Sequence, residues 1–159
     1  MRQGERSVRL KTPDSYRDTS VSLQRSIANI ESVLAQFGAD ATGVMVARRG
    51  DEAIAEIGFG YRERMYRIRL RLGTDPKDHR QRMRVLFWYV KAMLEAVAFG
   101  VVPAEEALLP YAELPDGFGG RTTVGKVLTS GDIGNLPQLN PEGLMALLGT
   151  KALPAPKEL

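Results

Sequence analysis

The chain has 159 residues and a mass of 17.5 kDa, which is the length of one ordinary domain. Hydrophobic residues make up 43% and charged residues 26%, a mixture that excludes a wholly disordered or collagen-like chain. There is no cysteine and only one histidine, His79, so disulfides, thiolate metal sites and most histidine-based catalysis are excluded. The net charge of +3 and a pI near 9.3 favour an anionic partner.

The first predicted element is a helix that follows a polar N-terminal segment. Residues 1–16 carry several basic side chains and no hydrophobic period, so we expect a flexible basic arm without a secretory signal. From Ser20 onward, apolar residues recur at spacings of three, four and seven, and Gly38 ends the pattern. This stripe is typical of an amphipathic helix.

Three segments rich in β-forming residues come next, at 42–48, 52–59 and 64–72. The first two are separated by Arg49-Gly50-Asp51, and the last two by 60–63, both short enough for tight turns. Short connections favour neighbouring antiparallel strands, so the pattern predicts a three-stranded meander.

A long helix is predicted from about Pro76 or His79 to Phe99, with Asp75 or Asp78 as its cap and Gly100 as its end. Its middle is apolar almost all round, so we expect it to lie centrally, with Trp88 and Tyr89 as packing residues. The order helix, three strands, helix predicts an α+β core over residues 17–100, with the helices on one face of the sheet.

Residues 101–159 are rich in glycine and proline and look too interrupted for a second core. We expect short helices at 103–109 and 141–149 in an otherwise irregular extension. The glycine-rich stretch 116–123 lacks the Gly-Lys-Ser/Thr ending of a phosphate loop and is interpreted as an ordinary loop.

The strongest functional signal is a row of arginines in the third strand. Because successive side chains of a strand point to opposite faces, Arg67, Arg69 and Arg71 share one face, while Tyr66, Ile68, Leu70 and Leu72 share the other. Arginines two positions apart lie about 6.5–7 Å apart, close to the phosphate spacing of a nucleic-acid strand. The row therefore predicts a phosphate track, and the candidate nucleic-acid-binding residues are Arg62, Arg64, Arg67, Arg69, Arg71, Arg80 and Arg84.

Two alternatives for these residues stay open. In the first alternative, the arginines of the row pair with Glu52, Glu56 or Glu63 across the hairpin and form an ordinary solvent-exposed face of the sheet. The second alternative concerns the nearby aromatic residues, which either stack on bases or, as we favour, pack in the core; they are Phe59, Tyr61 and Tyr66.

His79, beside two capping carboxylates, is interpreted as a helix-end feature and not as a metal ligand.

The segments Lys91 to Gly100, Glu105 to Pro110, Leu114-Pro115-Asp116-Gly117 and Arg121-Thr122-Thr123-Val124-Gly125 resemble a small protein family encoded by bacteriophages and related mobile elements. The resemblance covers roughly residues 20 to 130, and 118–120 interrupt its most specific turn. It implies a phage setting and supplies no catalytic residues. In element order the chain is also similar to double-stranded RNA-binding domains and single-strand annealing proteins, an analogy of topology alone.

Taken together, these features predict a non-catalytic, cytoplasmic nucleic-acid-binding protein that prefers single-stranded DNA over duplex DNA or RNA. We expect no cofactor, metal, membrane span or enzymatic activity, and a homo-oligomer is an open possibility. The alternative is a structural or assembly protein that uses the arginine face and the C-terminal extension for protein contacts. A small host-directed inhibitor is a third hypothesis.

Overall fold

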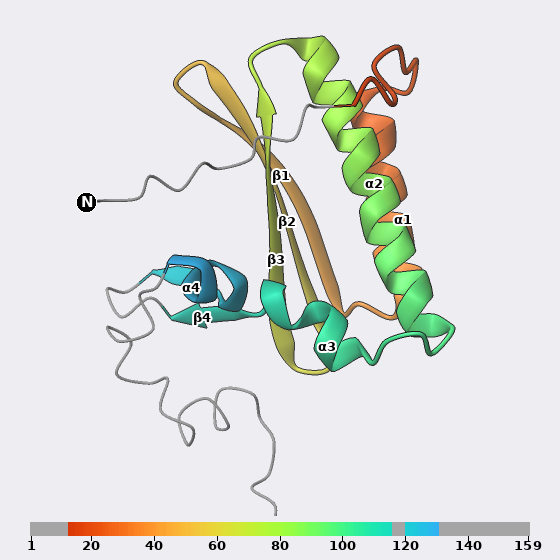
Figure 1. The fold of residues 1–159 in the computed structure, drawn as a ribbon, viewed down its shortest axis with the longest axis vertical. Coiled ribbons are helices and arrows are strands. Elements are labelled where there is room, and N and C mark those ends of the chain that lie inside the picture. The colour runs from red at the N-terminus through yellow and green to blue at the C-terminus, as the bar shows by residue number, and fades with distance from the viewer. Residues whose placement is uncertain (1–12, 116–119, 131–159) are drawn as a thin grey trace, which may run out of the picture.

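The computed structural model describes residues 13–115 and 120–130 (Figure 1). Most of the expected basic arm and all of the expected helix at 141–149 lie outside these residues. The elements in chain order are α1 (Leu23–Phe37), β1 (Ala41–Arg49), β2 (Glu52–Tyr61), β3 (Arg64–Gly73), α2 (Pro76–Ala98), α3 (Ala104–Leu108), the 3-10 turn η1 (Leu109–Tyr111), β4 (Glu113–Pro115), β5 (Arg121–Thr123) and α4 (Val124–Ser130).

Both long helices begin where a side chain satisfies a free backbone N–H group. The Ser22 hydroxyl accepts a hydrogen bond from the Arg25 N–H at 3.1 Å, so α1 starts at Leu23, three residues after the expected start. Gly38 ends it with a φ of 97°. The Asp75 carboxylate caps α2 by accepting from the Lys77 N–H at 2.8 Å, as expected from the sequence.

The three long strands form an antiparallel meander in the order β1-β2-β3, which confirms the predicted fold class. Gly50, with a φ of 61°, sits in the two-residue turn between Arg49 and Glu52. The helices α1 and α2 cover one face of this sheet (Figure 1). We call the other face the open face; its long strands contribute Ala41, Gly43, Met45, Ala47, Arg49, Glu52, Ile54, Glu56, Gly58, Gly60, Met65, Arg67, Arg69 and Arg71.

The hydrophobic core lies between the helix-covered face of the sheet and the two helices. Ile57 and Phe59 from β2 are fully buried there, together with Leu34 from α1 and Met83 from α2. The rings of Phe59 and Tyr66 stack at a centroid distance of 5.3 Å. Both aromatic residues therefore belong to the core, as favoured above, and neither lies on the arginine face.

The sequence predicted that α2 would be buried on all sides, and this prediction is wrong for one side of the helix. Trp88 and Tyr89 are 41% and 46% exposed, so they are not the buried packing residues that the apolar pattern predicted. The helix packs on α1 and on β3 through Leu86, Phe87 and Val90. The helix also contacts α3, and the Tyr89 hydroxyl is hydrogen-bonded to the Tyr111 hydroxyl of η1. Within residues 13–115 and 120–130, no helix is long and apolar enough to cross a membrane.

The chain after α2 has more regular structure at residues 121–130 than its composition suggests. Arg121–Thr123 form strand β5, which pairs antiparallel with β4 and corrects the interpretation of this stretch as a loop. Leu114, Val124 and Val127 are buried and join the main hydrophobic cluster. The β4–β5 hairpin and α4 lie on the side of the sheet opposite α1 and α2 (Figure 1).

Candidate nucleic-acid interface

The arginine row occupies the predicted face of β3. Tyr66, Ile68 and Leu72 are buried on the helix-covered side, whereas the side chains of Arg69 and Arg71 are 47% and 76% exposed. Arg67 is the exception, because only 19% of its side chain is exposed. The alternation of side chains along β3 thus predicted the correct face of the sheet for all three arginines. It did not determine how exposed each arginine is.

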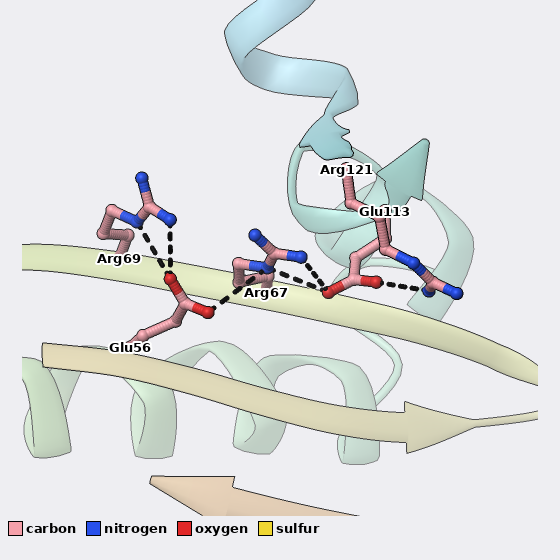
Figure 2. A network of polar contacts seen from close by, with 5 residues as sticks. All are labelled: Glu56, Arg67, Arg69, Glu113 and Arg121. Carbon is pink, nitrogen blue, oxygen red and sulfur yellow. Dashed lines mark hydrogen bonds and ion pairs between the residues drawn. The ribbon is translucent and has the colours of Figure 1, made fainter. Parts of the chain in front are cut away.

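Each arginine of the row has a carboxylate partner. Arg69 donates to the Glu56 carboxylate at 2.7 Å, and Arg71 lies 3.8 Å from the Glu52 carboxylate. Arg67 lies between two carboxylates, at 3.6 Å from Glu56 and 2.8 Å from Glu113 (Figure 2). The alternative in which Glu52 and Glu56 neutralise the row across the hairpin is therefore realised in part, and Glu113 adds a partner from outside the hairpin.

Glu113 is the junction between the sheet and the C-terminal hairpin. Its side chain is 11% exposed and receives Arg67 on one oxygen and Arg121 on the other, at 2.8 and 2.7 Å (Figure 2). Burial raises the pKa of this carboxyl, but the hydrogen bonds and charges of Arg121 and Arg67 outweigh burial, and the net pKa lies below the ordinary value. Glu113 is therefore ionised at neutral pH and holds both arginines in place.

The other four predicted residues do not join the row. Arg62 lies in the β2–β3 turn and pairs with Glu105, while Arg64 starts β3 on the same side of the strand as Tyr66. Arg80 and Arg84 belong to α2, on the helix-covered side of the sheet. The Arg84 guanidinium lies over the Phe87 ring at 4.4 Å and the Trp88 ring at 5.2 Å.

A groove lies between β3 and the C-terminal elements. We call it the basic groove; its volume is about 420 Å³, and its walls are Arg67, Arg69, Pro110, Tyr111, Arg121, Thr122, Thr123, Gly125, Lys126 and Thr129. Four cationic and three threonine side chains therefore line one concave surface, although the Thr129 hydroxyl donates to the Gly125 and Lys126 carbonyl oxygens. Arginine, lysine and threonine are the donors that proteins use to bind phosphate oxygens.

Arg121 and Lys126 are the members of this groove that sequence analysis missed. They come from β5 and α4 and meet the row only because the chain returns to the open face after α3. Lys126 makes no ion pair within the part of the chain that the structure describes. The only signal in the sequence was the cluster of one arginine and two threonines at 121–123.

Cations outnumber carboxylates on the open face. Six cations, namely Arg49, Arg67, Arg69, Arg71, Arg121 and Lys126, face three carboxylates, namely Glu52, Glu56 and Glu113, which leaves a surplus of three positive charges. Arg69 uses only Nε and Nη2 on Glu56, so the rest of its five N–H donors stay available for a ligand. Gly43, Ala47 and Gly58 leave low places on the floor beside these cations, and the Met45 side chain projects between Gly43 and Ala47.

Comparisons with protein-family models, with curated proteins and with solved structures give no match to the chain. The resemblance to a bacteriophage family therefore stays a prediction. Among residues 13–115 and 120–130, there is no cluster of three or more His, Asp or Glu side chains that could hold a metal ion.

Proposed function

We propose that the protein binds single-stranded nucleic acid, DNA in the first place, along the open face of its sheet and without catalysis. The observation that carries the proposal is the basic groove, which brings Arg69, Arg121 and Lys126 together from three separate elements. Arg71 continues the same path along β3, about 6.5–7 Å beyond Arg69. If one phosphate binds in the groove and the next binds beside Arg71, the distance between them matches the phosphate spacing along one nucleic-acid strand.

The role of Arg67 in this proposal differs from that of its neighbours. Its guanidinium lies between Glu56 and Glu113, so it stabilises the groove wall and is not a phosphate ligand. The path available to phosphates consists of Arg69, Arg71, Arg121 and Lys126. Neutralising four phosphates on a single strand predicts that the logarithm of affinity falls with the logarithm of salt concentration with a slope of about −3.

In the proposed binding mode, the protein contacts the sugar-phosphate backbone of the nucleic acid and has little preference for base sequence. Phe59 and Tyr66 lie in the core on the other face of the sheet, and the Tyr61 ring packs on Phe37 at a centroid distance of 4.6 Å. Tyr111 lines the basic groove, where its hydroxyl is hydrogen-bonded to that of Tyr89. The small residues on the open face leave room for a sugar-phosphate chain to approach the sheet. The groove cations form one track, and a positively charged groove that follows one backbone is the arrangement of proteins that bind single strands. A cytoplasmic location, where such a ligand occurs, is part of the proposal.

The test is fluorescence anisotropy with labelled single-stranded DNA, duplex DNA and RNA at several salt concentrations. The variant Arg69→Ala/Arg121→Ala/Lys126→Ala removes the groove cations, and Arg25→Ala/Lys77→Ala/Arg80→Ala removes the same charge from the helix side. We expect the first variant to lose at least tenfold in affinity at low salt, with a salt slope smaller by about 2, and the second to bind nearly as the native chain does. Absence of binding at low salt, or equal losses in both variants, would contradict the proposal.

An assembly function is the second candidate, favoured by exposed apolar side chains on α2 and just beyond its end. Trp88 and Tyr89 on α2 are exposed, and Phe99 and Val101 just beyond it are 85% and 79% exposed. Exposed aromatic side chains are enriched at protein interfaces. A stable complex with another protein that buries these residues, together with no nucleic-acid binding, would favour this candidate over the first.

A further inference from the structure

The two edges of the three-stranded sheet are protected to different degrees. At β3, Arg82 donates to the Arg71 carbonyl oxygen at 2.9 Å, and Tyr66 forms a bridge to Ala112. At β1, no strand or bridge covers the outer edge within residues 13–115 and 120–130. Unpaired backbone N–H and C=O groups along an edge strand are a template for pairing with another strand.

The first seven residues of β1 contain none of the usual devices against such pairing. Between Ala41 and Ala47 the strand has no charge, no proline and no bulge, which are the usual devices against edge association. Met45 on the open face is 58% exposed, and Val46 is 37% exposed although it points to the helix-covered face. Apolar surface of β1 is therefore exposed on both faces of the sheet.

We propose that β1 pairs antiparallel with β1 of a second copy of this chain, which makes a dimer with a continuous six-stranded sheet. A two-fold axis perpendicular to the sheet relates the copies, so the interface is self-complementary and both open faces lie on the same side. The proposal does not depend on the proposed nucleic-acid binding, because the edge contains none of the groove residues.

Two charges select one register: Asp40, just before β1, and Arg48, near the end of β1. With Val44 on the two-fold axis, Asp40 of each copy lies opposite Arg48 of the other, and both side chains are exposed without an ion pair in the described part of the chain. Opposite charges directly across a strand pair are favourable. The same register places Gly43 opposite Met45, the smallest side chain opposite the bulkiest, and Thr42 opposite Val46.

The dimer is expected to be weak and reversible. One strand-to-strand contact is at the small end of specific interfaces, so a dissociation constant on the order of 10 μM is expected. Sedimentation of the full chain without nucleic acid should therefore show a concentration-dependent equilibrium between monomer and dimer. A chain that stays monomeric at every concentration up to its solubility limit would overturn the proposal.

A charge exchange tests the register. Asp40→Arg alone and Arg48→Asp alone each create two like-charge contacts in the symmetric dimer, so each should raise the dissociation constant about tenfold or more. The combined variant Asp40→Arg/Arg48→Asp restores opposite charges and should dimerise as the native chain does. Dimerisation that neither single variant weakens, or that the combined variant fails to restore while circular dichroism shows a native fold, would overturn it.

Cysteine crosslinking gives an independent measurement, because the native chain has no cysteine. Val44→Cys places two thiols across the axis and should form a covalent dimer under mild oxidation. Ala47→Cys, on the same edge, is the matched control; its thiols lie far from each other in this register and should stay reduced. Crosslinking through position 47 but not 44 would exclude the proposed arrangement.

Discussion

Arg67 and Glu113 are 46 positions apart in the chain and form an ion pair of 2.8 Å that joins the centre of β3 to the β4–β5 hairpin. Both side chains are largely buried, at 19% and 11% exposure. The contact fixes one wall of the basic groove, since Arg121 binds the second oxygen of the same carboxylate. Arg67 therefore acts on the candidate site through Glu113.

Arg67→Ala is expected to lower the free energy of unfolding by about 1–3 kcal/mol, because it removes a charge-assisted hydrogen bond and leaves a largely buried carboxylate with one partner fewer. Arg69→Ala is the matched control in the same strand. Its side chain is half exposed, so its loss should cost less than about 1 kcal/mol. Urea unfolding at neutral pH measures both, and equal effects would contradict the difference in role.

Glu113→Gln should be destabilising at neutral pH and nearly neutral in acid. The folded-state pKa of Glu113 is below the ordinary value of 4.5, so ionisation stabilises the folded protein above that pH, and this contribution is lost as the pH falls below 4.5. The gap in unfolding free energy between the native chain and the variant should therefore close in acid.

The control for this pH series is Glu106→Gln, which changes an exposed carboxylate on α3. It should stay within about 0.5 kcal/mol of the native chain at pH 7. If the loss of unfolding free energy in Glu113→Gln were the same at pH 7 and pH 3, the charge of Glu113 would not be the source of its stabilising effect.

Gly125→Ala should destabilise the packing of α4. A Cβ atom at this position would lie 2.9 Å from the Pro110 carbonyl oxygen, so α4 or η1 must shift. A cost of about 1–3 kcal/mol is expected from such overpacking. Gly58→Ala is the control, because a Cβ there meets nothing within 4 Å, and it should be neutral or slightly stabilising. Thermal unfolding compares the two, and similar melting temperatures would refute the close approach of α4 to Pro110.

Trp88 reports on which side of the molecule a nucleic acid binds. It is the only tryptophan, it is 41% exposed, and it lies on α2, on the helix-covered side of the sheet. Acrylamide should quench its fluorescence in the folded protein, and saturating single-stranded DNA on the open face should leave this quenching unchanged. Protection of Trp88 by the ligand would instead indicate a site near Arg84 and would count against the basic groove.

Part of the candidate site was readable from the sequence. The two-residue period of β3 was enough to place Arg67, Arg69 and Arg71 on one face, because backbone geometry alone alternates the side chains. Arg121 and Lys126 were not predictable as partners of this row, because their position depends on how α3 and η1 return the chain to the sheet. The same return brings in Glu113, which changes Arg67 from an expected phosphate ligand into part of the groove wall.

The sequence by itself determined the local elements of this protein: Ser22, Asp75 and Gly38 set helix ends, and short turns made the three strands a meander. Those features depend on contacts between residues close in the chain. Only the tertiary structure decided what is covered. Trp88 looked buried by pattern and is exposed, while Val124 and Val127 sat in a glycine-rich region and are buried. Burial depends on which distant layers pack together, and local periodicity does not contain that information.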